Sequence, residues 1–420
     1  MAVAGSTARR RTAAAVGALA AGAAVLVAQS PAAHAETLTL PKTAKTFVIE
    51  MRGNGHGHGM SQYGARGAAI AGKTYRQILA FYYPKAILTR INRPRIRVLL
   101  SNTGTTTTIA ATSNVVLTGY PGTLPTAGIA RYRLVAGAGS GLVLQKLGTA
   151  AGSTWTPVRI SLADGTGFQQ ADFGALQLFL HDGTSTSYYG SLMAWRQHPR
   201  GTAGGVYTVD AVNWNRYAQG VVPREMPSSW QRAAVDAQAV AARTYGANAA
   251  ANPMSSTYDI CDTTWCQVYG GYQHLDARGN VLWQDFPSAA TDTSNQILSL
   301  DGQPIFAQFS ASNGGWTVSG GQPYLIAQAD PYDNAASGDP YLDYKRTVTV
   351  ASVASAFGLK TLTKISITKR DGHGAWGGRV LNVTLTGTDT SNKATTVTTS
   401  GNSFAGAIGL GTSWLRLLAS

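Results

Sequence analysis

Glutamate is rare in this 420-residue chain, and its scarcity narrows the search for a catalytic acid. The only three glutamates are Glu36, Glu50 and Glu225. Glu36 falls at the expected start of the mature chain, and Glu50 lies in a short strand-like run. Glu225 alone lies in a polar and aromatic setting between two helical patterns. Any working glutamic acid is therefore expected to be Glu225.

Cysteine is scarcer still, with Cys261 and Cys266 as the only two. Two cysteines cannot complete a tetrahedral zinc site alone, although His274 or a histidine near the N-terminus could add ligands. In an exported protein, two thiols this close in sequence favour a disulfide. We therefore predict a disulfide between Cys261 and Cys266, and no metal centre.

Beyond residue 35 the chain has no apolar run that approaches the length of a membrane span. Residues 1–35 have the three parts of a secretory signal: a basic start at 9–11, an apolar stretch at 12–28 and the small-residue site Ala-His-Ala at 33–35. An uncleaved anchor is the alternative, but the stretch is short and the cleavage site follows it closely. We predict cleavage near Ala35 and a secreted or wall-associated protein without a membrane span.

Acidic residues are outnumbered by basic ones, which gives a formal net charge of +14. Removing residues 1–35 takes away three arginines and no acids, so the charge falls to 14 − 3 = +11. Such a charge suits an anionic cell envelope or nucleic acid. The basic residues form no run outside the signal, and the chain is expected outside the cell, so we predict no nucleic-acid partner.

The most helix-like stretch is residues 212–245, VNWNRYAQGVVPREMPSSWQRAAVDAQAVAARTY. Its spacing predicts a short helix over 213–222 and a second helix, capped at Ser228 or Ser229, that continues to residue 245. Pro223 and Pro227 disfavour helical geometry at the residues before them, so we expect Glu225 in a kinked connection. The adjacent apolar side chains would desolvate its carboxyl and raise its pKa. The alternative is a solvated or capping loop residue.

The glycine-rich stretch GNGHGHG, residues 53–59, predicts a loop whose backbone can approach another group closely. A strand-like run precedes it at 47–51, and short helices are expected at 61–72 and 75–83. Its histidines, His56 and His58, are loop residues or structural hydrogen-bonding groups, because two histidines alone give a weak metal signal.

Residues 91–205 are rich in Thr, Gly and Val, with short alternating runs and frequent turn residues. This pattern predicts an all-β module. Its aromatic residues either bind glycan or, in their more ordinary role, fill the core and turns: Trp155, Tyr188, Tyr189 and Trp195.

The segment YAQGVVPREMPSSWQRAAVDAQAVAARTY, residues 217–245, resembles the signature of the SpoIID/LytB (stage II sporulation protein D) family of cell-wall proteins. Members are lytic transglycosylases of peptidoglycan or enhancers of wall amidases. The resemblance implies that Glu225 is the catalytic acid and that Arg243 is functional. Arg243 lies roughly 20 Å along the second helix, so it binds substrate or holds the fold. Asp236 stands where many members have Lys.

Residues 53–84, GNGHGHGMSQYGARGAAIAGKTYRQILAFYYP, are similar to a second family signature. The resemblance places the family's histidine on His56, with Ser61 and Gln62 following, and implies that they line the glycan groove. In the sporulation protein this signature follows the glutamate segment, so its early position here implies an N-terminal segment that returns to the cleft. AQFSASNGGWTVSG, residues 307–320, resembles a third loop and implies sugar contacts by Ser310, Ser312 and Asn313.

The resemblance implies an α+β, β-rich fold in which a helical pair carries Glu225. We expect a segment lining the cleft at 36–90, a β-rich module at 91–205 and a SpoIID/LytB catalytic-type domain at 206–420.

The implied function is a secreted lytic transglycosylase that cleaves peptidoglycan glycan strands between N-acetylmuramic acid and N-acetylglucosamine. Its product is a 1,6-anhydro end, and no cofactor is required. One alternative is a muramidase that uses water, with Asp259 or Asp262 as its second carboxylate. Otherwise these two residues cap a loop through Asx turns. The other alternative is a non-catalytic wall-binding protein that enhances a partner amidase.

Overall fold

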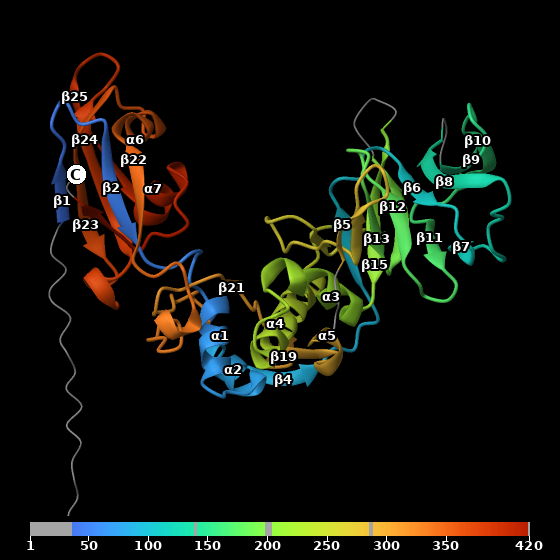
Figure 1. Ribbon diagram of the computed structural model, residues 1–420, viewed down its shortest axis with the longest axis horizontal. Coiled ribbons are helices and arrows are strands. Elements are labelled where there is room, and N and C mark those ends of the chain that lie inside the picture. The colour runs from blue at the N-terminus through green and yellow to red at the C-terminus, as the bar shows by residue number, and fades with distance from the viewer. Residues whose placement is uncertain (1–35, 138–140, 198–203, 285–288, 419–420) are drawn as a thin grey trace, which may run out of the picture.

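The computed structural model describes residues 36–137, 141–197, 204–284 and 289–418, and the expected signal at 1–35 lies outside them. Seven α-helices and twenty-six strands in these ranges form an α+β fold rich in β-structure, which confirms the expected fold class. Figure 1 shows an elongated molecule with strands at both ends and most helices between them. No helix in the described ranges is long and apolar enough to cross a membrane.

One end of the molecule is built from both ends of the described chain (Figure 1). Strand β2 (Thr46–Met51) lies between β22 (Tyr344–Thr349) and β26 (Leu415–Leu418) and is antiparallel to both. A second sheet has the order β1-β23-β24-β25, and one apolar core joins the two sheets. The other elements are β1 (Glu36–Thr39), α6 (Val350–Ala356), β23 (Thr361–Arg370), the 3₁₀ turn η2 (Ala375–Gly377), β24 (Val380–Thr388), β25 (Ala394–Ser400) and α7 (Gly401–Ala407).

The opposite end is a larger β unit with an eight-stranded sheet, β10-β9-β8-β6-β12-β13-β17-β18, and a six-stranded sheet, β16-β5-β15-β14-β11-β7. Alternate residues of its strands are buried between the sheets, as Ile96, Val98 and Leu100 are in β5. The strands are β5 (Ile96–Leu100), β6 (Thr107–Ala110), β7 (Val115–Leu117), β8 (Ile129–Ala136), β9 (Leu142–Gly148), β10 (Thr156–Leu162), β11 (Gly167–Gln170), β12 (Leu176–Phe179), β13 (Ser185–Tyr188), β14 (Ser191–Arg196), β15 (Val206–Val212), β16 (Ile260–Cys261), β17 (Gln273–Leu275) and β18 (Val281–Gln284).

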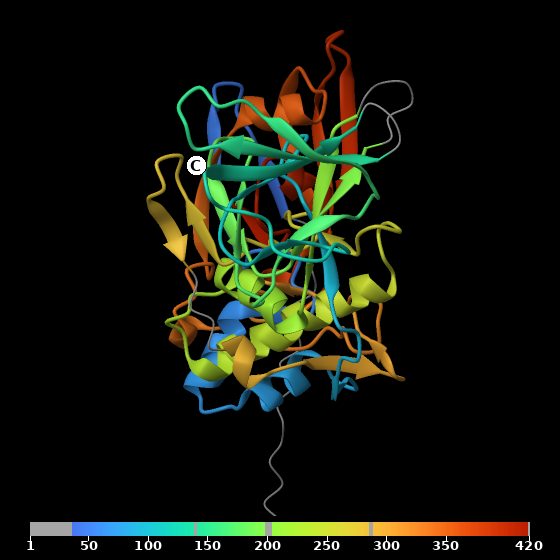
Figure 2. The ribbon, with the colours of Figure 1, turned by 90° about the vertical axis from the view of Figure 1, so that its right-hand side faces the viewer.

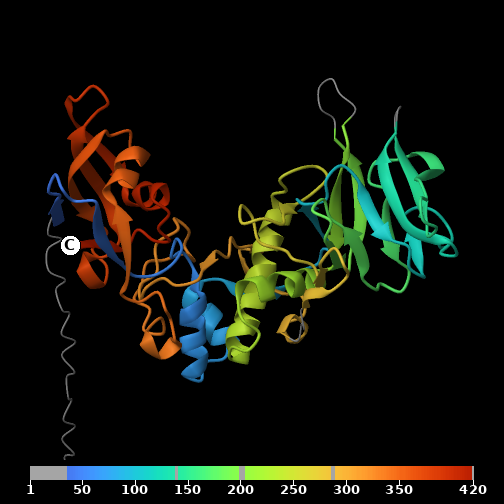
Figure 3. The ribbon, with the colours of Figure 1, turned by 45° about the horizontal axis from the view of Figure 1, so that its top comes forward.

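Between these units lies a helical region around α4 (Arg232–Ala251). Ala234, Ala237 and Ala241 are fully buried, and such small side chains let α4 lie close against α1, α2 and α3. Figure 2 shows the yellow-green helices α3 and α4 below the green and teal strands of the larger β unit, and Figure 3 shows α4 between α1 and that unit. The other elements are β3 (Met60–Ser61), α1 (Gln62–Ile70), α2 (Tyr75–Tyr82), β4 (Ile87–Arg90), α3 (Trp214–Glu225), α5 (Ala289–Asp292), β19 (Gln296–Leu300), β20 (Gln303–Pro304), β21 (Phe309–Ser310) and the 3₁₀ turn η1 (Ala335–Ser337).

The helix boundaries around Glu225 differ from the sequence-based expectation. Helix α3 continues through Pro223, and Glu225 is its last residue rather than part of a kinked connection. A proline in the last turn removes one backbone donor, while the next hydrogen bond survives: Met226 N–H donates to the Val222 carbonyl at 2.9 Å. Helix α4 begins at Arg232, later than a cap at Ser228 or Ser229 would give.

Candidate functional site

An open cleft of about 390 Å³ lies at the C-terminal end of α3, and we call it the Glu225 cleft. Five separate stretches of the chain meet in it, and the earliest is the glycine-rich loop at 53–59. Glu225 is the one carboxylate among the described residues that line it. The lining residues are His56, Arg224, Glu225, Tyr245, Thr264, Trp265, Cys266, Gln267, Val268, Gln308 and Phe309.

Glu225 is half-buried at the C-terminal end of α3, and its carboxylate accepts a hydrogen bond from a side chain of α1. The Gln62 side-chain amide donates to Glu225 Oε2 at 3.2 Å. Desolvation raises the pKa of Glu225, and the hydrogen bond from Gln62 opposes part of that rise. The carboxyl therefore keeps its proton to a higher pH than an exposed glutamate would, as a general acid requires.

Gln62 reaches Glu225 because α1 is fixed against the cleft at its first turn. Ser61 caps α1 by accepting a hydrogen bond from the Gly64 N–H at 3.0 Å, and β3 pairs with β21 just before the helix. A Cβ at Gly64 would lie 2.1 Å from the Tyr82 hydroxyl, so this approach requires glycine. In the structure Gln62 contacts Glu225, and His56 of the same N-terminal segment lines the cleft.

The glycine-rich loop presents His56 to the cleft. Gly55 has a φ of +105°, and a Cβ there would lie 2.5 Å from the Cβ of Ser310, so the loop passes where only glycine fits. The His58 backbone N–H donates to His56 Nδ1 at 2.9 Å, and the two rings stack. Desolvation, followed by the charges of His58 and Arg379, lowers the pKa of His56 to about 4. At neutral pH the ring is uncharged and its Nε2 carries the hydrogen, because Nδ1 accepts.

The predicted sugar-binding residues Ser61, Ser312 and Asn313 lie behind the cleft wall and do not line it. All three are fully buried, and each contacts an aspartate. Ser61 donates to Asp333 at 2.8 Å, Asn313 donates to Asp330 at 2.7 Å, and Ser312 donates to Asp339 at 2.6 Å. Here they hold loops together, and a buried hydroxyl or amide with a carboxylate partner has no need of a sugar.

The same polar network supports the histidine loop. Ser310 also lies outside the cleft lining, and its hydroxyl accepts from the Gly57 N–H at 3.3 Å. Buried Arg379 donates to the carbonyls of Gly55 at 3.4 Å and Asn313 at 3.3 Å. Burial raises the pKa of Asp330 to about 6 and that of Asp333 to about 7. The sugar contacts expected of Ser310 are thus replaced by a contact that positions the loop carrying His56.

Arg243 lies inside the protein, away from the cleft. Its side chain is fully buried in α4, and its guanidinium donates to the backbone carbonyls of Ala290, Thr293 and Gln296 at 2.9–3.1 Å. Of the two roles considered for it, substrate binding and holding the fold, this geometry supports the second. It ties α4 to the segment from α5 to β19.

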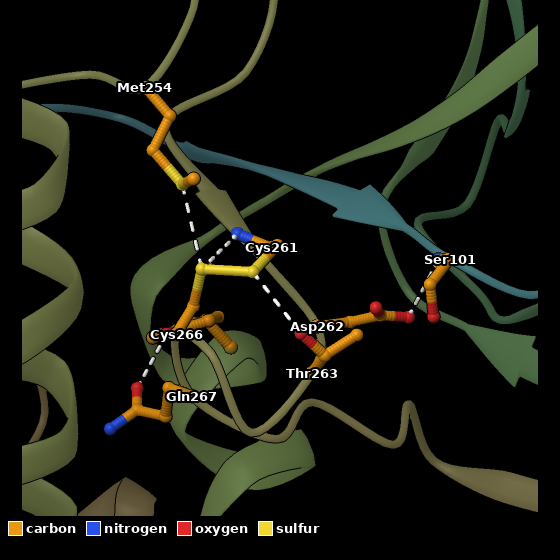
Figure 4. The surroundings of a disulfide bond; sticks show 8 residues. Ser101, Met254, Cys261, Asp262, Thr263, Cys266 and Gln267 are labelled. Atoms are coloured by element: carbon orange, nitrogen blue, oxygen red, sulfur yellow. Dashed lines mark hydrogen bonds between the residues drawn. A yellow bond between two sulfur atoms is a disulfide. The ribbon is translucent and has the colours of Figure 1, made fainter. Parts of the chain in front are cut away.

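Cys261 and Cys266 form a disulfide that closes a short loop after β16 (Figure 4). Their thiols are therefore not available as zinc ligands. His274 lies in β17, with Nδ1 2.8 Å from the Thr186 hydroxyl and its ring stacked on Trp283. No group of three or more His, Cys, Asp or Glu side chains in the described ranges is placed to hold a metal ion.

Removing this disulfide should lower the free energy of unfolding by about 2 kcal/mol, because a closed loop of this length restricts the unfolded chain by that amount. The measurement is urea unfolding of the wild-type protein and of the double variant Cys261→Ser, Cys266→Ser, each with and without reductant. The wild-type midpoint should fall in reductant and the variant midpoint should not. Equal midpoints in all four samples would contradict the prediction.

Asp259 and Asp262, the candidate second carboxylates, do not line the Glu225 cleft. Asp259 is buried and binds Arg97, whose backbone N–H and Nη2 donate to it at 2.9 and 2.7 Å. Asp262 accepts from the Ser101 N–H at 3.1 Å, as Figure 4 shows. Both residues fasten the segment around β16 to β5, a structural role close to the loop capping considered from the sequence.

Most of the lining residues were not identified from the sequence as parts of the site, among them Arg224, Tyr245 and Trp265. Arg224 precedes Glu225, and its guanidinium lies 3.4 Å from the centre of the Trp283 ring. Tyr245 projects from α4, and Trp265 from the disulfide loop. Arg224 sits beside the catalytic candidate in the sequence, so adjacency was an available signal. The other two are common aromatic residues whose placement depends on contacts distant in the sequence.

The fold and the cleft define an α+β protein with one half-buried glutamic acid, an amide that orients it and a neutral histidine on the facing loop. Residues 202–300 match the family model described as stage II sporulation protein, SpoIID. With the similar proteins that follow, this match confirms the resemblance to the SpoIID family.

Three known proteins are similar to parts of this chain. The chain is 38% identical over 122 residues to the amidase enhancer of Bacillus subtilis (strain 168), which is 27% of this chain and 15% of that protein. It is 29% identical over 169 residues to the stage II sporulation protein D of the same organism, covering 36% and 48%. An uncharacterized protein of Brachyspira hyodysenteriae is 33% identical over 165 residues, covering 36% and 42%. The matched stretches span less than half of each relative.

Proposed function

We propose that this protein is a secreted lytic transglycosylase of peptidoglycan. It cleaves the bond between N-acetylmuramic acid and N-acetylglucosamine and leaves a 1,6-anhydro end on the muramic residue. The observation that carries the proposal is the Glu225 cleft, an open cleft lined by a single, partly desolvated carboxyl with a raised pKa. Because the chain resembles the SpoIID family and an amidase enhancer, we infer that its substrate is a component of the cell wall.

The proposed reaction uses one carboxyl twice. Protonated Glu225 donates its proton to the glycosidic oxygen as the bond from that oxygen to muramic C1 breaks. The resulting carboxylate then accepts the proton of the muramic C6 hydroxyl as O6 bonds to C1. The carboxyl ends protonated, as it began, and no water is consumed.

The neighbouring side chains suit this reaction. Gln62 holds one oxygen of Glu225, which orients the carboxyl toward the cleft. Neutral His56 offers a ring N–H to sugar hydroxyls. Arg224 places a positive charge on the wall, which suits the lactyl carboxylate that muramic residues expose once their peptides have been removed.

The arrangement argues against a hydrolytic muramidase. Such an enzyme pairs its acid with a second carboxylate about 5–9.5 Å away, as nucleophile or as base for water. Among the described residues, the cleft lining holds no such partner for Glu225, and Asp259 and Asp262 are committed to β5 and the turn that follows it. A transglycosylase needs no second carboxylate, because the muramic hydroxyl replaces water.

Export and wall association belong to the same proposal. The basic start, apolar stretch and Ala-His-Ala site of residues 1–35 support secretion, and the positive charge of the remainder suits an anionic wall. A second candidate function, enhancement of a wall amidase, is supported by the similarity to the amidase enhancer.

The deciding experiment is mass spectrometry of purified peptidoglycan, intact and stripped of peptides, after incubation with the protein lacking residues 1–35. Anhydro-muramic ends are the expected product, released faster from stripped strands. Reducing ends would replace the proposal with a hydrolase. The absence of cleavage, together with stimulation of an added amidase, would establish the enhancer function instead.

The pH dependence of cleavage offers an independent check on Glu225. Because the protonated carboxyl is the active acid, activity should fall as the pH rises through its pKa. The Gln62 hydrogen bond lowers that pKa, so Gln62→Leu should move the alkaline limb of the pH–rate profile to higher pH. Gln62→Glu should move it higher still, by like-charge repulsion. If the alkaline limb of the pH–rate profile did not move in either variant, the group that titrates there would not be Glu225.

A further inference from the structure

Trp265 is held in an unusual position for a large apolar side chain. All nine tryptophans lie in the described ranges, and the other eight are buried or partly buried. Trp265 is 91% exposed and lines the Glu225 cleft. An exposed apolar residue alone needs no explanation, but a tryptophan on the wall of a cleft that holds an acid does.

The loop that carries Trp265 is anchored by contacts before and after this residue in the sequence. The disulfide closes it from Cys261 to Cys266 (Figure 4), and the Cys266 N–H donates to the Thr263 carbonyl at 3.0 Å. The next residue, Gln267, is buried and accepts a hydrogen bond from the Tyr217 hydroxyl at 2.5 Å. Such anchoring presents the indole at a defined place, so little conformational entropy is lost when a ligand covers it.

The acid and the tryptophan are fixed by the same helix. Tyr217 lies in α3, two turns before Glu225, so the contact with Gln267 sets the loop relative to the carboxyl. Tyr245 and Phe309 add further aromatic surface to the same cleft. A ligand in the Glu225 cleft therefore meets both aromatic surface and hydrogen-bonding groups.

We propose that Trp265 is a stacking platform for a sugar ring next to the bond that Glu225 cleaves, which makes it a residue that binds and positions the glycan. Pyranose rings of N-acetylhexosamines present a face of C–H bonds, and the partially negative π face of an indole attracts such groups. Polar sugar edges then point toward His56, Arg224 and Gln308. This inference rests on the proposed function and specifies the ligand as a β-1,4-linked N-acetylhexosamine strand.

The test measures binding without cleavage, in a Glu225→Gln background, with peptide-free glycan strands as the probe. Trp265→Ala should weaken binding about tenfold or more, by analogy with the loss of an aromatic platform for a stacked base. Trp265→Tyr should restore most of the affinity, since it keeps a ring. Phe173→Ala, which removes an aromatic residue that is 69% exposed in the larger β unit, is the matched control and should bind like the parent.

Fluorescence gives a second readout that a merely structural role would not move. Iodide should quench Trp265 emission in the unliganded protein, and glycan strands should protect it; Trp265→Ala should lose both effects. Unchanged glycan affinity in Trp265→Ala would overturn the proposal, and so would a variant that keeps glycan affinity but loses binding to a wall amidase.

The outcomes separate this inference from the proposed function. In otherwise wild-type protein, Trp265→Ala should raise KM for stripped strands more than it lowers kcat, because the platform does not touch the reacting atoms. If Trp265→Ala formed anhydro products with an unchanged KM, the stacking role of Trp265 would be wrong and the transglycosylase activity would still be supported. If the protein bound glycan through Trp265 but did not cleave it, the stacking role would be supported and the transglycosylase activity would be wrong.

Discussion

Glu225→Gln should reduce the release of anhydro-muramic ends by about 10²–10⁴-fold, the contribution typical of a positioned general acid. The amide has nearly the same shape and can still pair with Gln62. Its N–H, however, is a far weaker acid than a carboxyl and cannot protonate the glycosidic oxygen. The free energy of unfolding should stay constant or rise slightly, because a neutral amide is less costly to desolvate than a carboxylate. The measurement is the rate of anhydro product formation from stripped strands, with urea unfolding alongside.

Asp262→Asn is the matched control for this experiment, since Asp262 is an acid of the neighbouring loop that does not line the cleft. Its amide oxygen can still accept from the Ser101 N–H, so fold and rate should both be retained. A loss of activity in Asp262→Asn equal to that in Glu225→Gln would contradict the single-carboxyl mechanism. Full activity of Glu225→Gln in stimulating an amidase, with no cleavage by either protein, would favour the enhancer.

Arg243→Met should lower the free energy of unfolding by about 3 kcal/mol or more. The guanidinium donates to three backbone carbonyls inside the protein, and each carbonyl left without a donor costs about 1–3 kcal/mol. Desolvation lowers the pKa of Arg243 to about 10, so the side chain is still charged at neutral pH. The measurement is urea unfolding at pH 7, read as the shift of the midpoint at constant slope.

Arg232→Met, in the first turn of the same helix, provides the comparison. Arg232 is partly exposed and paired with Asp236 and Asp292, and surface ion pairs contribute about 0–1 kcal/mol. The variant should therefore unfold near the wild-type midpoint. If both variants lost stability equally, the carbonyl contacts of Arg243 would not be its main contribution.

Much of the fold follows from local pattern. The strand-like run at 47–51 lies within β2, and the two short helices after the glycine-rich loop lie within a few residues of expectation. These elements bury one face or both, so the order of residue types is sufficient. The end of α3 was misplaced, because the cost of Pro223 depends on where in the helix it falls.

The candidate site, too, contains residues that the sequence could predict and residues that it could not. Glu225 could be singled out because glutamate is rare and its neighbours are apolar. Ser61, Ser312 and Asn313 were assigned to sugar because Ser and Asn in a glycine-rich loop suit either a ligand or an internal network. Only the position of Asp330, Asp333 and Asp339, brought from a distant segment, decides between the two. Trp265 was overlooked for a related reason, since its exposure depends on the whole surrounding surface.

The place of β2 between β22 and β26 sets an order of events in folding. Glu50 of β2 accepts a hydrogen bond from Arg416 of β26 at 2.5 Å, across 366 positions in the sequence. Pairings of such separation form slowly and late, because a long loop must close before they contribute. The glycine-rich loop begins two residues after β2, so the wall that carries His56 is completed only when β26 has arrived. A chain made only as far as α3 would hold Glu225 without that wall, so the proposed cleavage would begin only after β26 had paired with β2.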